Sequence, residues 1–259
     1  MSTTTAPEST SPARPPLADV GGVPFHRLVA IELRKAVDTR AGTWLMIVMA
    51  SISLVVVGAY ALWGPESEQS FGVLLGLTSV PLAMLLPIVG IMLATQEWST
   101  RTGLVTFTLE PRRGLVITAK LIASLILGLV VMAAAFAAAA LVTGVTGGEW
   151  TLTGISAWGL VLAVGIYVLQ GAGFGLAFLN TPFAIVASLV LPTAWSIATS
   201  LVTKLTDVAP WLDLDRTTGP LTGGTMAGQD WAKLATSVLV WVGIPIAVGT
   251  WRVLRREIK

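Results

Sequence analysis

Long stretches of this sequence carry no charged side chain, and this feature limits the fold more than any other. Phe71 to Thr95 and Leu121 to Val145 are uncharged, and Glu149 is the single charged residue between Lys120 and Lys204. Each uncharged stretch exceeds the ~20 apolar residues that a helix needs to cross a bilayer. Only 12% of the chain is charged, whereas soluble domains carry about 25%. The sequence therefore predicts an all-α integral membrane protein.

Six membrane spans are expected, near 43–63, 71–95, 121–144, 155–179, 182–203 and 234–254, within a membrane domain of residues 42–254. The stretch 155–203 is too long for one crossing, so we expect a hairpin at Asn180-Thr181-Pro182, with Thr181 capping the second helix. Residues 1–23 are rich in Ser, Thr, Pro and Ala, which predicts a disordered tail. Residues 255–259 form a second, shorter tail.

Residues 24–41 are expected to form an amphipathic helix in the plane of the membrane interface. Phe25, Val29 and Leu33 recur at helical spacing on one side, and Arg27 lies opposite them. Glu32 projects on the apolar side. Two interpretations are open for it: it extends to the interface or pairs with Lys35 on the same helix, or it has a partner in the segment 96–120.

The basic residues predict the orientation of the spans. If the amino terminus is cytoplasmic, 13 of the 16 Lys and Arg residues lie on that side, and only Lys204, Arg216 and Lys233 lie outside. We therefore expect both termini to be cytoplasmic and the protein to be a multi-pass component of the plasma (inner) membrane. The outer segment 204–230 is either a surface loop or a re-entrant element that dips into the outer leaflet.

The segment 96–120 holds six charged residues between two apolar spans, too many to lie in hydrocarbon. It is also much longer than a turn requires. We therefore expect a cytoplasmic segment on which another protein docks. Its apolar residues suit a groove and its charged residues suit the polar rim of an interface. Pro111 suits the first turn of the helix that follows.

The same segment resembles the link between the second and third spans of ATP-binding-cassette (ABC) exporter permeases of the second type. The matching positions are Glu97, Thr102 with Gly103, Leu109 to Arg113, and Ala119 with Lys120. Two departures from that pattern are present. The pair runs Thr-Gly rather than Gly-Thr, and Pro111 follows Leu109 by two residues rather than three.

The resemblance implies a permease subunit coupled to a separate ABC ATPase, which binds ATP and Mg²⁺, and paired with a second permease chain, identical or related. It also implies that 96–120 is the coupling segment. The residues expected to dock the ATPase are Glu97, Arg101, Thr102, Gly103, Phe107, Leu109, Pro111, Arg112 and Arg113. We expect a bacterial exporter, with the lipid bilayer and the ATPase as partners and no nucleic acid.

Several other activities lack the residues that they require. The phosphate-binding pattern GxxxxGK[ST] is absent, so ATP hydrolysis is expected on the partner. The chain has no cysteine, and no ionisable residue occupies the middle of any expected span. This argues against ion-coupled transport and intramembrane proteolysis. We expect no catalytic, cofactor or metal site in this chain, and hence no enzyme.

Glycines at four-residue spacing are expected to let helices pack closely. The pairs are Gly72 with Gly76 in the second span and Gly171 with Gly175 in the fourth. An alternative function stays open beside the exporter. The chain would then be a non-transporting scaffold or sensor that recruits a cytosolic partner through the same segment, and an adjacent ATPase gene would favour the exporter.

Overall fold

The computed structural model describes residues 22–65, 69–202, 205 and 207–255. These residues form helices and no named strand. Six helical segments are long and apolar enough to cross a bilayer. They are α2 (Arg40–Trp63), α3 (Phe71–Ser99), α5 (Arg113–Thr146), α6 (Ala157–Phe178), α7 (Thr181–Leu201), and a last segment made of α10 (Asp230–Val238), η3 (Leu239–Gly243) and α11 (Ile244–Arg255). The predicted all-α membrane fold is confirmed.

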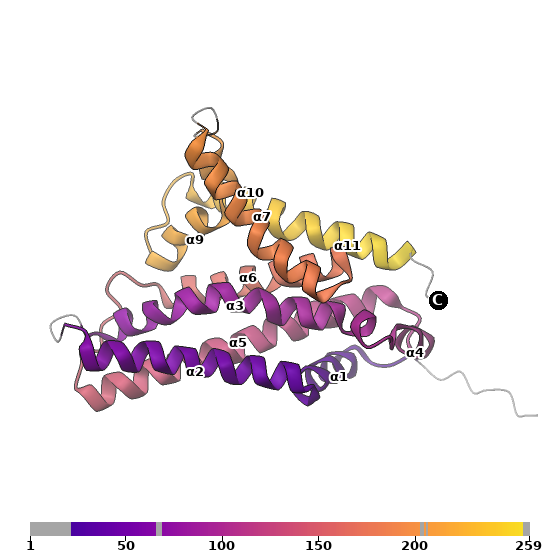
Figure 1. Ribbon diagram of the computed structural model, residues 1–259, viewed down its shortest axis with the longest axis horizontal. Helices are drawn as coiled ribbons and strands as arrows, with labels where there is room; N and C mark the ends of the chain where they lie inside the picture. The colour runs from indigo at the N-terminus through magenta and orange to yellow at the C-terminus, as the bar shows by residue number, and fades with distance from the viewer. Residues whose placement is uncertain (1–21, 66–68, 203–204, 206, 256–259) are drawn as a thin grey trace, which may run out of the picture.

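Helices α3 and α6 form the centre of the bundle (Figure 1). Helices α2 and α5 pack against α3 on one side, while α7 and α11 pack against α6 on the other. Four shorter helices complete the fold: α1 (Phe25–Asp38), α4 (Gly103–Leu109), α8 (Ala209–Leu212) and α9 (Leu214–Gly223). The predicted tails, 1–23 and 255–259, fall mostly outside the described residues.

Glycines make the close contact between α3 and α6 possible. A Cβ atom on Gly171 would collide with the backbone of Pro87, and one on Gly175 would lie 2.7 Å from the Cβ of Ala94. Gly72 and Gly76 serve another contact, because a Cβ atom there would meet Leu152 and Ile155 of the α5–α6 connection. All four glycines therefore lie at close contacts, and those of Gly72 and Gly76 are with a connecting loop rather than with a helix.

Helix α1 is separate from the first span. The chain turns at Thr39, which has extended dihedral angles and whose hydroxyl accepts a hydrogen bond from the N–H of Gly42 at 3.2 Å. The buried face of α1 contains Leu28, Val29, Glu32 and Ala36, and it packs on α5 and α2. Phe25, expected on the apolar face, is exposed, because protein contacts fix the rotation of the helix.

Two spans are longer than expected, and one helix cap differs. Helix α3 continues to Ser99, and α5 begins at Arg113, so the 96–120 segment is largely helical. The hairpin at 180–182 is present, but Asn180 caps α7 by accepting from the N–H of Phe183 at 3.0 Å. The hydroxyl of Thr181 is instead 2.7 Å from that of Thr95.

Helix α9 packs against α6, and α8 and α9 both pack against α10. The carbonyl of Thr222 accepts from the N–H of Ser156, just before the start of α6. Asp215, at the other end of α9, accepts from the hydroxyl of Tyr167 at 2.8 Å. Tyr167 is the eleventh of the 22 residues of α6. An acidic side chain thus lies near the midpoint of a span, although the spans themselves lack one there, and this weakens the sequence argument against an ion-coupled function.

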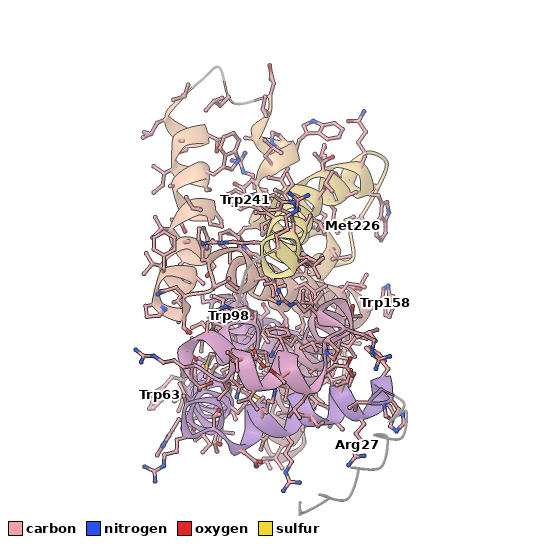
Figure 2. All side chains as sticks on the ribbon, turned by 90° about the vertical axis from the view of Figure 1, so that its right-hand side faces the viewer. Arg27, Trp63, Trp98, Trp158, Met226 and Trp241 are labelled. Carbon is pink, nitrogen blue, oxygen red and sulfur yellow. The ribbon has the colours of Figure 1, made fainter. Side chains whose placement is uncertain are left out.

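Most of the basic residues lie at one end of the bundle, near the ends of the helices. Helices α1 and α4 and the carboxyl end of α11 all lie at this end (Figure 1). The Arg113 guanidinium donates to the carbonyl of Val253 at 3.0 Å. Figure 2 looks onto this end, where Arg27 points away from the bundle. We call it the basic end. The positive-inside rule would place it in the cytoplasm.

This orientation predicts the result of a reporter experiment. A reporter fused to the carboxyl terminus should be active only in its cytoplasmic form. One inserted after Gly228, in the turn before α10, should be active only in its external form. The two reporters lie at opposite ends of the last span, so activity on the same side of the membrane would contradict six crossings.

Candidate functional site

The α3–α5 connection at the basic end brings together most of the residues singled out in the sequence. It runs from Thr100 to Arg112 and contains the short helix α4. Arg101 adopts a left-handed conformation with φ of 58°, and the N–H of Thr102 donates to the carbonyl of Glu97. This tight turn after α3 places Thr102 as the N-cap residue of α4, which begins at Gly103.

One face of α4 is fixed on the bundle by Phe107. This side chain is 8% exposed, and its ring centroid lies 6.3 Å from that of Trp98. The Arg113 guanidinium lies 5.4 Å from the same ring, a distance typical of a cation–π contact. Phe107 was expected to enter a groove on the partner. In this chain the ring is already buried, so Phe107 contributes little to the exposed surface of α4.

Three other apolar side chains of α4 remain on the surface. Leu104 is 54% exposed, Val105 58% and Leu109 75%. They lie on a helix of seven residues between two spans, at the end of the bundle where the basic residues gather. We call Leu104, Val105 and Leu109 the α4 patch.

Glu110, Arg112 and Arg113 hold the end of α4 and the start of α5 in place. Arg112 donates to both carboxylate oxygens of Glu110, at 2.7 and 2.9 Å, and to the carbonyl of Val23 at 3.1 Å. Arg112 and Arg113 were expected at the rim of a docking surface, but both make contacts within the chain. Pro111 precedes the N-cap residue Arg112, so it lies just before α5 rather than in its first turn.

The ion pair of Glu110 with Arg112, between α4 and α5, is expected to weaken in acid. Hydrogen bonds from Arg112 lower the pKa of Glu110 from 4.5 to about 2. A lowered pKa means that the pair stabilises the fold fully above pH 4.5 and loses its contribution as the pH falls toward 2. A spin label on a cysteine at position 104 should therefore gain mobility over this range. Glu110→Gln should remove the pH dependence, and a transition that persists in Glu110→Gln would assign it to another group.

A second set of charged residues lies buried beneath α4. The ammonium group of Lys120 in α5 is 2.6 Å from Glu32 of α1 and 2.7 Å from Glu97 of α3. It also donates to the carbonyl of Leu93 at 3.1 Å. Lys35 of α1 bridges the same carboxylates, at 2.7 Å from Glu32 and 3.2 Å from Glu97. We call Glu32, Lys35, Glu97 and Lys120 the four-charge cluster.

The four-charge cluster is electrically neutral, with two carboxylates and two ammonium groups. Burial disfavours the charged form of Lys35, but Glu32 and Glu97 outweigh it and raise the pKa of Lys35 above its ordinary value. Three of the four side chains are almost wholly buried, and Lys35 is partly exposed. The cluster joins α1, α3 and α5 directly below the connection that carries α4.

The position of Glu97 corrects its expected role. It was assigned to the docking surface, yet it lies inside α3 and is 1% exposed. Glu32 contacts Lys35, its first expected partner, and Lys120, which belongs to the segment named as the second. Glu110 and Lys120 were absent from the set of residues expected to dock the partner, and Lys35 was named only as a partner of Glu32. Their signal in the sequence was proximity to a charge of opposite sign, which is too common to be selective.

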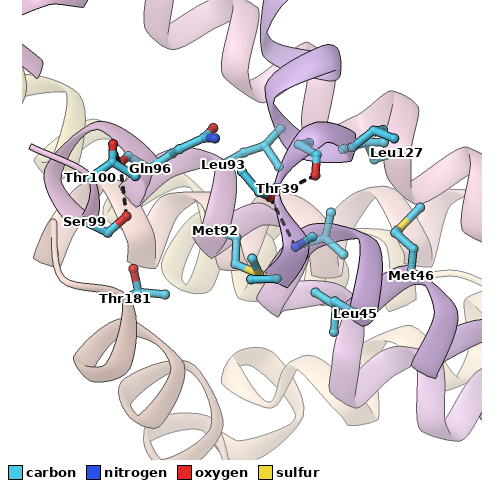
Figure 3. A pocket seen from close by; sticks show the side chains of 15 residues that line it. Thr39, Leu45, Met46, Met92, Leu93, Gln96, Ser99, Thr100, Leu127 and Thr181 are labelled. Carbon is cyan, nitrogen blue, oxygen red and sulfur yellow. Dashed lines mark hydrogen bonds between the residues drawn. The ribbon is translucent and has the colours of Figure 1, made fainter. Parts of the chain in front are cut away.

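Two cavities open near this connection. One of about 740 Å³ runs between α1, α3, α4 and α5, and Val105, Leu109 and Ile31 contribute to its wall. The other, of about 290 Å³, lies between the α1–α2 turn and α3 (Figure 3). Leu45, Met46 and Met92 make its wall mostly apolar, and Thr181 closes one side. The first cavity extends the α4 patch into a groove between α1 and α4.

Glu110 is paired with Arg112, and the members of the four-charge cluster are paired with one another. No group of three or more His, Cys, Asp or Glu suited to a metal ion occurs in the part of the chain that the structure describes. Comparison of the sequence with protein-family models and with curated proteins finds no match.

Proposed function

We propose that this chain is the membrane permease subunit of an ATP-driven exporter of the ABC class, coupled to a separate ATPase through α4. The observation that carries the proposal is the α4 patch. Apolar side chains that are more than half exposed, on a short helix outside the spans, favour a protein partner over a plain connecting loop.

The internal contacts of α4 support a mechanical role. Phe107 fixes one face of α4 to the bundle. Arg112, which follows α4, bonds both to Glu110 and to the carbonyl of Val23. The four-charge cluster then joins α1, α3 and α5. A displacement of α4 by a partner would therefore be transmitted to the spans as a unit, because packed elements deform little.

The remaining parts of the proposal follow from the same reasoning. The ATPase binds ATP and Mg²⁺, this chain provides the path through the membrane, and a second permease chain completes the assembly. The basic end faces the cytoplasm of a bacterial cell, where the ATPase is available. A scaffold or sensor that recruits a cytosolic protein through α4 is the second candidate, and the exposed patch fits it equally well.

Enzyme assays separate the two candidates. The chain purified alone should hydrolyse no ATP, and the chain isolated with its partner from native membranes should carry ATPase activity that responds to the permease. A partner without a nucleotide-binding sequence would favour the scaffold. ATP hydrolysis by this polypeptide alone would contradict the proposed division between the subunits.

A further inference from the structure

A cavity of about 340 Å³ lies at the opposite half of the bundle from α4, between α3, α5, α6 and α9. Apolar side chains such as Leu82, Met132 and Val164 form most of its wall. Its polar groups come mainly from α6 and α9: the hydroxyl of Tyr167, the carboxylate of Asp215 and the hydroxyl of Thr218. The cavity thus combines an apolar wall with one acidic group.

The Asp215 carboxylate is positioned by a hydrogen bond, and it has no salt bridge among the described residues. The Tyr167 hydroxyl is 2.8 Å from one carboxylate oxygen and 3.0 Å from the hydroxyl of Thr218. Every salt bridge found among the described residues involves other acidic groups. Asp215 is exposed at the surface of the chain, and in a bilayer its surroundings would include lipid.

Asp215 lies at a depth where an ionised carboxylate without a positive partner is unfavourable. Tyr167 lies at the midpoint of α6, and the Trp241 indole, twelfth of the 26 residues of the last span, donates to the carbonyl of Leu212 near the start of α9. Both contacts place the start of α9 well inside the bundle. An ionised carboxylate at that depth is unfavourable unless a positive group accompanies it.

We propose that this cavity binds an organic cation, an ammonium or phosphonium group attached to an apolar body. The positive group would lie at Asp215 and the apolar body against the wall formed by α3, α5 and α6. Small metal ions fit less well, because Mg²⁺ and Ca²⁺ require six or more oxygen ligands and the cavity offers a single carboxylate. An anion would be repelled by the same group.

Two sources supply such a cation: the ammonium headgroup of a membrane lipid, and a free amphiphilic cation. Both would use the same carboxylate. The site is independent of the proposed exporter function, and its test requires neither an ATPase nor transport.

The probe is tetraphenylphosphonium, with tetraphenylborate as a control of the same shape and opposite charge. Binding to the full chain is measured by equilibrium dialysis in phosphatidylglycerol nanodiscs, with empty nanodiscs subtracted. The phosphonium should bind and the borate should not. Asp215→Asn should weaken binding at least tenfold and Tyr167→Phe by a few-fold, whereas Asp215→Glu should retain it. Asp207→Asn, which removes an exposed carboxylate outside the cavity, should have no effect.

Adding phosphatidylethanolamine to the nanodiscs distinguishes a lipid headgroup from a free cation as the natural ligand. Competition with the probe assigns the site to a lipid headgroup, and unchanged binding assigns it to a free cation; both results support the site. Equal binding of phosphonium and borate would overturn the proposal. So would full binding by Asp215→Asn, provided that this variant and Asp215→Glu elute as folded protein in size-exclusion chromatography.

Discussion

Replacing Lys120 with methionine is expected to cost about 3–5 kcal/mol of stability, the range observed when one partner is removed from a buried ion pair. The ammonium group holds Glu32 at 2.6 Å and Glu97 at 2.7 Å, and all three side chains are at most 4% exposed. Without it, two buried carboxylates would share only Lys35. The midpoint of thermal unfolding of the purified chain in detergent measures the loss.

A second substitution distinguishes charge from packing. Glu32→Gln combined with Lys120→Met leaves Glu97 facing Lys35, which restores a neutral cluster, and should recover at least half of the lost stability. Lys233→Met is the control, because its pair with Asp230 is 3.5 Å long and partly exposed, so its loss should cost under about 1 kcal/mol. Equal costs for Lys120→Met and Lys233→Met would contradict the structural role of the cluster.

If α4 docks the proposed ATPase, replacing Leu109 with aspartate is expected to abolish that association while the chain still folds. Leu109 is 75% exposed, so the substitution disturbs little inside the chain. An apolar contact at the centre of an interface commonly contributes about 2 kcal/mol or more, and a buried unpaired carboxylate adds to the loss. Pull-down of the partner from membranes, at matched permease yield, measures the effect.

Leu201→Asp is the matched control, because Leu201 is the same residue type with similar exposure, 77%, at the end of α7 away from α4. This variant should retain the partner. Phe107→Ala should also reduce association, but through loss of the Trp98 contact and hence with lower stability. Full retention of the partner by Leu109→Asp would move the docking surface away from α4.

The architecture was predictable because apolar length and charge distribution are local properties of the sequence. The ends of α3 and α5 were harder to predict, since Glu97 and Lys120 normally mark the end of a span. They are tolerated inside the helices because each is paired with a residue distant in sequence. Glu32 had an open assignment for the same reason: two partners were in reach, and the fold uses both.

The candidate site was predictable in location but not in detail. The segment 96–120 stood out by charge and length, whereas its inward and outward faces depend on tertiary contacts. Phe107 and Leu109 are both large apolar residues on a seven-residue helix, and only the tertiary packing against residues such as Trp98 and Val116 decides that the first is buried. The placement of Asp215 beside Tyr167 likewise requires the fold of α8 and α9.

Cross-linking from position 109 tests the central claim most directly. The chain contains no cysteine, so Leu109→Cys introduces a unique site for a photoactivatable maleimide in native membranes, and Leu201→Cys is the control. The account predicts that position 109, and not position 201, cross-links to a polypeptide with the GxxxxGK[ST] phosphate-binding sequence. Adducts at position 109 that contain only lipid, or only proteins without that sequence, would contradict it.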